Sequence, residues 1–173
     1  MKIAIFSDIH DNLSNLKKAL QVCQERKIKS IFFLGDLCSP FTLSYLGESK
    51  AKVYFVFGNN DGDKVKIIEK AKNFPNIEIF YENVFGEKKI SGVKIGFVHW
   101  REIALRMAQS RKYKVVLFGH THKKEKKKIG KTLMINPGEI GGNLFPPSFA
   151  ILDLKTFKVE FIDLEKIPLI ISP

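Results

Sequence analysis

Short apolar runs alternate with helical periodicity in the first half of the chain. Residues 2–6, 31–34 and 53–57 each have the length and continuous hydrophobicity of a buried strand. Asn12 is suited to cap a helix after the first run, and apolar residues follow it at helical spacing. They are Leu13, Leu16, Leu20 and Cys23. This order of strands and helices predicts a parallel sheet covered by helices.

Strands dominate the second half of the chain. Three strand pairs are predicted: residues 88–91 with 93–98, 124–129 with 132–135, and 149–154 with 158–164. Ser91-Gly92 and Gly130-Lys131 supply the turns of the first two pairs. A helix at residues 101–111 and a buried strand at residues 115–118 lie among them.

These elements predict one α/β domain over residues 1–173, built as a two-sheet β-sandwich flanked by helices. The strands of the second half make a single doubly wound sheet a poorer fit. A further helix is predicted at residues 62–73, with Val65, Ile68 and Ala71 as its inner positions. The tail from residue 167 onward is expected to be loosely held.

No apolar run approaches the roughly 20 residues that a membrane-spanning helix needs. The first residues have no small-residue cleavage site, so they are predicted to be a strand and not a signal peptide. We therefore expect a cytoplasmic protein with no membrane partner. Cys23 and Cys38 are isolated, match no metal or redox spacing, and are expected to be reduced thiols.

The net charge of the chain is +11 at pH 7. Such a charge attracts anions at long range, including nucleic acid, but a Lys-rich solvated surface gives the same composition. The basic residues are scattered apart from the run at residues 123–128, and no base-stacking aromatic residues interleave with that run. The sequence therefore favours a solvated surface over nucleic acid as a partner.

Polar residues with metal-binding chemistry follow the predicted strands where each strand ends. All four histidines of the chain belong to this group. Because the carboxyl ends of strands line the ligand crevice of open α/β sheets, five strand ends would deliver these side chains to one rim. If each strand continued, alternate residues of the first and last segments would share one face. The segments are Asp8-Ile9-His10, Gly35-Asp36, Gly58-Asn59-Asn60-Asp61, His99 and Gly119-His120-Thr121-His122.

Carboxylate, amide and imidazole groups together suit Mn²⁺, Ni²⁺, Co²⁺, Fe²⁺ or Zn²⁺ better than Ca²⁺, and we expect Mn²⁺ or Ni²⁺ first. A structural zinc site is not predicted, because the chain has no thiolate cluster. Seven candidate ligands exceed what one ion needs, so we expect two divalent ions bridged by one carboxylate. The candidates are Asp8, His10, Asp36, Asn59, His99, His120 and His122.

These segments resemble the calcineurin-like metallophosphoesterase superfamily, whose pattern is DxH, GD, GN, H and GHxH. The match extends from Met1 to about Leu164, and the short length and Ile135-Asn136-Pro137-Gly138 are similar to the small YfcE-like branch of phosphodiesterases. Each motif alone occurs often by chance, whereas all five in order are specific. The resemblance implies metal-dependent hydrolysis of small phosphodiesters by a hydroxide that bridges the two ions.

The resemblance also implies a division of the ligands between the ions. Asp8, His10 and His122 would bind the first ion, Asn59, His99 and His120 the second, and Asp36 both. Relatives form dimers or tetramers, so a homo-oligomer is also expected. The catalytic set implied for this chain, with one basic residue added from its own sequence, is Asp36, Asn59, His99 and Arg101.

Three positions beside the site depart from the family pattern. Asn60 stands where many relatives have a histidine that can act as general acid, so we expect good leaving groups to be strongly favoured. His99 is followed by Trp100 and Arg101 where relatives have Gly-His. Arg101 would grip a phosphate oxygen, or it is an exposed residue in the first turn of a helix. Trp100 would narrow the rim, or it packs in the core or an interface.

The remaining polar residues near the motifs are expected to have structural roles. Glu139 is expected to point away from the site, because a carboxylate near an anionic substrate would be unusual. Asp61 is expected to cap the following helix, although it could also support a ligating histidine. Cys38 is expected to be a packed thiol in its loop.

Two other functions compete with a phosphodiesterase. One is a non-catalytic, metal-binding interaction scaffold, since one branch of the superfamily resembles a trafficking scaffold. That branch has lost part of its ligand set, whereas every ligand position is filled here. The other is a nucleic-acid binding protein or nuclease, which only the net charge suggests.

Overall fold

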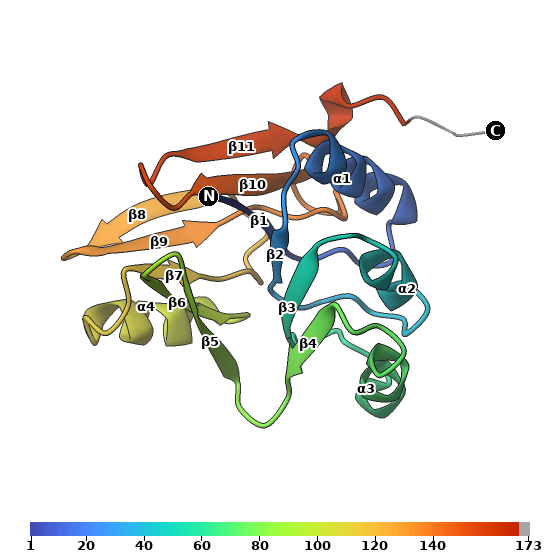
Figure 1. Cartoon of the computed structure of the whole chain (residues 1–173), viewed down its shortest axis with the longest axis horizontal. Helices are drawn as coiled ribbons and strands as arrows, with labels where there is room; N and C mark the ends of the chain where they lie inside the picture. The colour runs from blue at the N-terminus through green and yellow to red at the C-terminus, as the bar shows by residue number, and fades with distance from the viewer. Residues whose placement is uncertain (170–173) are drawn as a thin grey trace.

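The strands form two mixed sheets in the computed structural model, which describes residues 1–169 (Figure 1). The first sheet contains β1 (Lys2–Phe6), β2 (Ser30–Phe33), β3 (Lys52–Val56), β4 (Ile77–Phe80), β10 (Ser148–Asp153) and β11 (Val159–Asp163). Its order is β11-β10-β1-β2-β3-β4, with β1 to β4 parallel and the last two strands antiparallel. The parallel part places the ends of β1, β2 and β3 side by side.

The second sheet is built from the hairpins of the second half of the chain. It contains β5 (Phe85–Ile90), β6 (Val93–Val98), β7 (Val115–Leu117), β8 (Glu125–Ile129) and β9 (Thr132–Asn136). Its order is β5-β6-β7-β9-β8, in which β6, β7 and β9 are parallel neighbours. Ile90 pairs with Val93 and Ile129 with Thr132, which confirms both predicted turns.

Helices cover the outer faces of the two sheets. α1 (Leu13–Glu25), α2 (Leu43–Gly47) and α3 (Lys64–Ala71) pack on the first sheet, and α4 (Arg101–Gln109) packs on the second. Figure 1 shows α4 on the opposite side of the molecule from the other three. A short 3-10 helix, Leu164–Lys166, follows β11. The predicted two-sheet α/β sandwich flanked by helices is confirmed as one domain with four layers.

Strand β1 shows why the apolar runs are continuous. Ile3 and Ile5 face the layer between the sheets, while Ala4 and Phe6 face α1. Successive side chains of a strand point to opposite faces, so a strand covered on both faces needs apolar residues throughout. All four of these residues are 0% exposed.

Helix α3 differs from its prediction. It spans Lys64–Ala71 within the predicted residues 62–73, but Ile67 is its buried residue and Val65 is 67% exposed. The helix packs against α2 and β4, two elements that the sequence pattern did not predict. The contacts with α2 and β4, and not the apolar periodicity of α3 alone, therefore determine which face of the helix is buried.

The chain end is only partly described. Ile167, the first residue of the predicted loose tail, packs against the core around α1. Residues 170–173 of that tail lie outside the described residues. Within residues 1–169, no helix has the length and apolarity needed to cross a membrane.

Phe97 on β6 lies in the apolar layer between the sheets, so its truncation tests how tightly that layer is packed. Its ring is 0% exposed and makes edge contacts with Phe32 and Phe80, each with centroids 5.0 Å apart. We expect Phe97→Ala to lower the free energy of unfolding by about 3–5 kcal/mol in urea titrations, because the truncation leaves a cavity. Phe41→Ala, at a ring 49% exposed, should change it by less than about 1 kcal/mol. Equal effects of both changes would contradict tight packing between the sheets.

Candidate metal centre

The ends of five strands meet at one rim of the sandwich. β1, β2 and β3 of the first sheet lead into the segments with Asp8, Asp36 and Asn59. β6 and β7 of the second sheet lead into His99 and His120. The structure thus brings together candidates from both sheets, as the strand-end pattern predicted.

Asp8, His10 and His122 form the first group of donor atoms. Asp8 Oδ1 lies 3.4 Å from His122 Nε2 and 4.0 Å from His10 Nε2. The rings of His10 and His122 are stacked, with centroids 5.1 Å apart. Two imidazole nitrogens and one carboxylate oxygen can therefore face one ion.

Asn59, His99 and His120 form the second group. His99 Nε2 lies 2.9 Å from Asn59 Oδ1 and 3.2 Å from His120 Nδ1. Asp36 stands between the groups, with Oδ1 3.6 Å from His99 Nε2 and Oδ2 3.7 Å from His10 Nε2. Each oxygen of Asp36 thus faces a different group, which is the geometry that a bridging carboxylate requires.

Left-handed backbone conformations produce this convergence. Five of the seven candidates have φ between 46° and 65°. Such values are uncommon for residues other than glycine, and they cluster at functional sites where surrounding contacts hold them. The strands end before these residues, so the paired ligands meet through tight turns and not through the strand continuation that the sequence suggested. The five are Asp8, His10, Asp36, His120 and His122.

The buried polar atoms fit a divalent cation. Asp8 is 0% exposed, and its Oδ1 and His10 Nε2 are buried without a hydrogen bond among the described residues. Burial raises the pKa of Asp8 to about 7 and lowers the pKa of His99 to about 4. A buried carboxylate without a partner is costly, and a cation between these donors would compensate it. Oxygen and nitrogen donors of this kind suit first-row transition metals.

His99 is oriented by a backbone carbonyl. Its Nδ1 donates to the oxygen of Leu34 over 2.7 Å, so Nε2 carries the lone pair that faces the second group. Cys38 Sγ lies 3.5 Å from His10 Nδ1, on the side of that ring away from Asp8 and Asp36. Burial raises the pKa of the Cys38 thiol to about 11, which agrees with a packed, protonated thiol.

Asp61 holds the two turns that carry Asp36 and Gly58. It is 4% exposed and accepts backbone hydrogen bonds from Asp36, Leu37 and Gly58, at 2.6–3.1 Å. The prediction that Asp61 caps the next helix is wrong, because Asp63 caps α3. The physical reason is that these buried N–H groups need an acceptor and no strand partner supplies one.

Gly58 is required by the close approach of Asp36 and His99. A Cβ atom on Gly58 would overlap Asp36 Oδ1 and would lie 2.8 Å from His99 Cε1. Any larger residue would therefore push the second group apart.

Glu139 lies against the site, and the prediction that it points away is wrong. It is 0% exposed, and its Oε2 lies 2.9 Å from His122 Nδ1. Burial raises its pKa, but hydrogen bonds from Phe145, His122 and two further residues outweigh burial and leave the pKa below its usual value. A carboxylate behind a ligating imidazole fixes the ring and raises its basicity. The signal for this role in the sequence was a single acidic residue in the otherwise uncharged stretch of residues 132–148.

Arg101 is held by an ion pair. Its Nε and Nη2 donate to the two carboxylate oxygens of Glu125 at 3.1 and 3.2 Å, so this ion pair uses two of its five N–H groups. Trp100 stands edge-on to His99, with ring centroids 5.3 Å apart, and precedes α4 as its N-cap residue. Glu125 could not be foreseen as the partner from the sequence, because it begins β8, the edge strand of the second sheet, 24 positions from Arg101.

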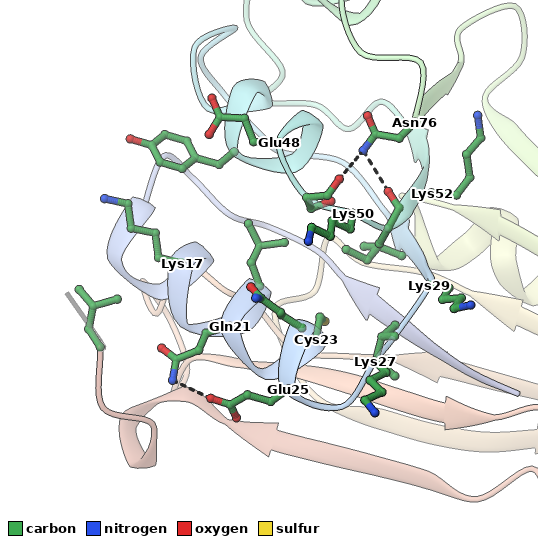
Figure 2. Close-up of a pocket in the computed structure, with 18 residues that line it drawn as sticks. Lys17, Gln21, Cys23, Glu25, Lys27, Lys29, Glu48, Lys50, Lys52 and Asn76 are labelled. Atoms are coloured by element: carbon green, nitrogen blue, oxygen red, sulfur yellow. Dashed lines mark hydrogen bonds between the residues drawn. The ribbon is translucent and has the colours of Figure 1, made fainter. Parts of the chain in front are cut away.

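A large cavity lies elsewhere. It has a volume of about 1290 Å³ and is bordered by α1, α2 and the amino-terminal ends of β2 and β3 (Figure 2). Lysine side chains stand around it, and none of the seven candidate ligands lines it. It is therefore at the opposite ends of the parallel strands from the metal centre.

Most of the chain matches a known protein family. A model described as the calcineurin-like phosphoesterase superfamily domain matches residues 1–157. The chain belongs to this superfamily. The match confirms the predicted enzyme class, a metal-dependent phosphoesterase, and the family to which the motif order pointed.

Two similar proteins cover most of the chain. Phosphodiesterase MJ0936 of Methanocaldococcus jannaschii is 33% identical over 168 residues, which are 95% of this chain and 100% of that protein. Phosphodiesterase YfcE of Escherichia coli strain K12 is 26% identical over 170 residues, which are 88% of each. The chain therefore matches both relatives over most or all of their length.

Solved structures agree with the fold. A structure described as a novel archaeal phosphodiesterase has a TM-score of 0.86 at 32% identity, covering 94% of this chain and 99% of that one. Vps29 from Entamoeba histolytica has a TM-score of 0.66 at 23% identity, with the same coverage of 94% and 99%. The second likeness concerns the fold alone.

Glu139 can be tested through metal affinity. We expect Glu139→Gln to weaken binding of the ion nearest His122 by about 10–100-fold in calorimetric titrations of metal-stripped protein, because His122 loses its anionic partner. Glu69→Gln, on the exposed side of α3, is the matched control and should leave the affinity unchanged. Equal affinity of the Glu139 variant and the parent protein would contradict this role.

Proposed function

We propose that this protein hydrolyses small phosphodiesters with a pair of divalent transition-metal ions. The observation that carries the proposal is the arrangement of seven donor residues in two groups with Asp36 between them. Beside them, Oδ1 of Asp8 is buried and has no hydrogen bond within residues 1–169. The names of the relatives, which are phosphodiesterases, support the choice of a diester.

We propose that the residues divide between the two ions as the resemblance implies. In the proposal Asp8, His10 and His122 hold one ion, and Asn59, His99 and His120 hold the other, with Asp36 shared. Mn²⁺ or Ni²⁺ fits this donor set, and Co²⁺, Fe²⁺ or Zn²⁺ is also compatible with it. When bound, the two ions would lower the pKa of water for attack on phosphorus and neutralise charge on the phosphoryl oxygens.

The chain's own residues shape access and orientation. Asp8, Asp36 and His99 are buried and form the closed wall of the centre, whereas Asn59 and His120 are exposed. A substrate would therefore enter from the side of Asn59 and His120. The open side includes a neutral amide, which limits repulsion of an anionic diester.

Asn60 fixes the shared carboxylate and supplies no acid. Its backbone N–H donates to Asp36 Oδ1 over 2.7 Å and its side-chain amide donates to Asp36 Oδ2 over 2.8 Å. An amide cannot protonate a departing alkoxide, and all four histidines of the chain are ligand candidates. In the proposal the leaving group therefore departs without a proton from a histidine.

Arg101 is shared with Glu125 in the proposal. Glu125 accepts one N–H from Nε and one from Nη2, so a phosphate oxygen would be bound by Nη1 and the second N–H of Nη2. A homodimer or homotetramer stays a prediction from the resemblance alone.

Metal reconstitution tests the proposal. We expect metal-stripped protein to hydrolyse bis-p-nitrophenyl phosphate only after Mn²⁺, Ni²⁺ or another divalent ion is added, measured as release of p-nitrophenolate. Asp36→Asn should reduce kcat by about 100-fold or more, because the shared carboxylate loses its charge. Asp63→Asn is the matched control, since asparagine caps a helix as well as aspartate does.

The outcomes separate the enzyme from a scaffold. Turnover that requires metal and disappears in Asp36→Asn, but not in Asp63→Asn, supports the phosphodiesterase. Two ions bound per chain without turnover under any metal would instead favour a non-catalytic interaction scaffold of the same fold.

The absence of a general acid can be tested with methyl aryl phosphates. From p-nitrophenol to unsubstituted phenol as leaving group, we expect kcat/KM to fall by about 10²–10⁴-fold, the contribution that a general acid would otherwise make. Asn60→His should flatten this dependence relative to Asn60→Ala, which loosens Asp36 equally but adds no acid. A flat dependence in the parent protein would refute the assignment.

A further inference from the structure

The segment of residues 135–138 runs beside the turn of residues 119–122, which carries two of the candidate metal ligands. β7 and β9 pair in parallel, with Leu117 opposite Ile135, so both strands end at the same rim. Asn136 is the last residue of β9. It therefore lies beside the start of the turn, where the pairing between the two strands has stopped.

The side chain of Asn136 supplies hydrogen bonds to that turn. It is 0% exposed, and its Nδ2 donates to the oxygen of Gly119 over 2.8 Å and to Oγ1 of Thr121 over 3.0 Å. Its Oδ1 accepts from the N–H of Gly138 over 3.0 Å. A carbonyl oxygen can only accept and a backbone N–H can only donate, so these partners fix which way the amide faces. Both N–H groups of the amide and its oxygen are therefore used inside the protein.

The two bonds that Asn136 donates lie on either side of His120. Gly119 precedes this histidine and Thr121 follows it. The backbone of His120 is left-handed, with φ of 65°, and so is that of His122, with φ of 58°. Residues other than glycine keep such conformations only where surrounding contacts hold them. The buried amide of Asn136 supplies two such contacts.

This turn delivers one histidine to each group of donor atoms. Nδ1 of His120 lies 3.2 Å from His99 in the second group, whereas Nε2 of His122 lies 3.4 Å from Asp8 in the first. Glu139 contacts the ring of His122, so it acts on the first group. The hydrogen bonds of the buried asparagine hold the chain around both histidines, so it is placed to act on both groups.

We propose that Asn136 is a positioning residue that sets the affinity of both metal ions, because it fixes the turn that delivers one histidine to each of them. This inference rests on the proposed function for its two ions. Only one residue separates His120 from His122, so a shift of the turn would displace both. Loss of the Asn136 amide should therefore weaken both ions, whereas loss of the Glu139 charge should weaken one.

The metal affinity of Asn136→Ala tests this role. We expect calorimetric titration of the metal-stripped variant with Mn²⁺ to show both ions weakened by about 10–100-fold, the loss typical of groups that orient metal ligands. Under the same conditions Glu139→Gln should weaken only the ion nearest His122. Co²⁺-loaded protein gives a second reading, because the visible absorption of this ion depends on ligand geometry. We expect the spectrum of Asn136→Ala to differ from that of the parent protein.

Thr121→Val is a milder variant that tests the same turn even if Asn136→Ala does not fold. Valine keeps the shape of threonine but removes Oγ1, the acceptor of one of the two amide N–H groups. We expect both ions to weaken, by less than in Asn136→Ala because the bond to Gly119 remains. The double variant should be no weaker than Asn136→Ala, since the bond that Thr121→Val removes is already absent there.

Asn76 provides the matched control. Its Nδ2 donates to the oxygens of Leu46, Ser49 and Ala51 at 2.9–3.3 Å, beside the large cavity far from the metal centre (Figure 2). Asn76→Ala should lower the free energy of unfolding in urea, but leave both metal affinities and the Co²⁺ spectrum unchanged. Parent-like affinities and spectrum in Asn136→Ala, or the same losses in Asn76→Ala, would overturn the inference.

None of these measurements needs turnover, so they separate the inference from the proposed function. If Asn136→Ala weakens both ions but the parent protein hydrolyses no diester under any metal, the positioning role stands and the enzyme is overturned. If the parent hydrolyses bis-p-nitrophenyl phosphate and Asn136→Ala keeps both affinities, the enzyme stands and the positioning role is overturned. A parent protein that binds a single ion would overturn the two-ion site and this inference together.

Discussion

Two fully buried carboxylates, Asp8 and Asp36, set the constraint on which the rest of the site depends. Removing a carboxylate from water is costly unless hydrogen bonds or cations replace the lost solvation. The amides of Asn60 satisfy the oxygens of Asp36, and the N–H of His120 reaches Oδ2 of Asp8 over 3.1 Å. Oδ1 of Asp8 has no hydrogen-bond partner among the described residues, and a divalent cation there would compensate its charge.

The packing of the four layers fixes the positions of the donor residues relative to one another. The second sheet contributes His99 and His120, and the first contributes Asp8 and Asp36. The donors face one another only because the apolar layer between the sheets fixes the relative position of β1–β3 and β6–β7. Left-handed turns then redirect the chain at each strand end, and groups such as Asp61 hold the turns through backbone hydrogen bonds.

Glu139 connects the metal centre with the surface beside it. Its Oε2 contacts His122 and accepts from the N–H of Asn143, while Oε1 accepts from the N–H groups of Leu144 and Phe145. One carboxylate therefore orders both the ring of His122 and the backbone of residues 143–145.

The sequence by itself determined every strand except β4, the two tight hairpin turns, the two-sheet architecture and the group of residues at the strand ends. These features depend on local periodicity, on turn residues such as Ser91-Gly92, and on the fact that parallel strands end at one rim. The family followed from the order of the motifs.

Only the tertiary structure decided what the neighbouring polar residues do. Asp61 holds turns and does not cap a helix, Glu139 faces His122, and Arg101 pairs with Glu125. Leu37 as a partner of Asp61, His122 as that of Glu139 and Glu125 as that of Arg101 each lie 17 or more positions away in the sequence. A buried charge takes whichever donor the folded chain brings within hydrogen-bond distance, and that choice is made by packing between elements and not by the spacing of residues along one of them.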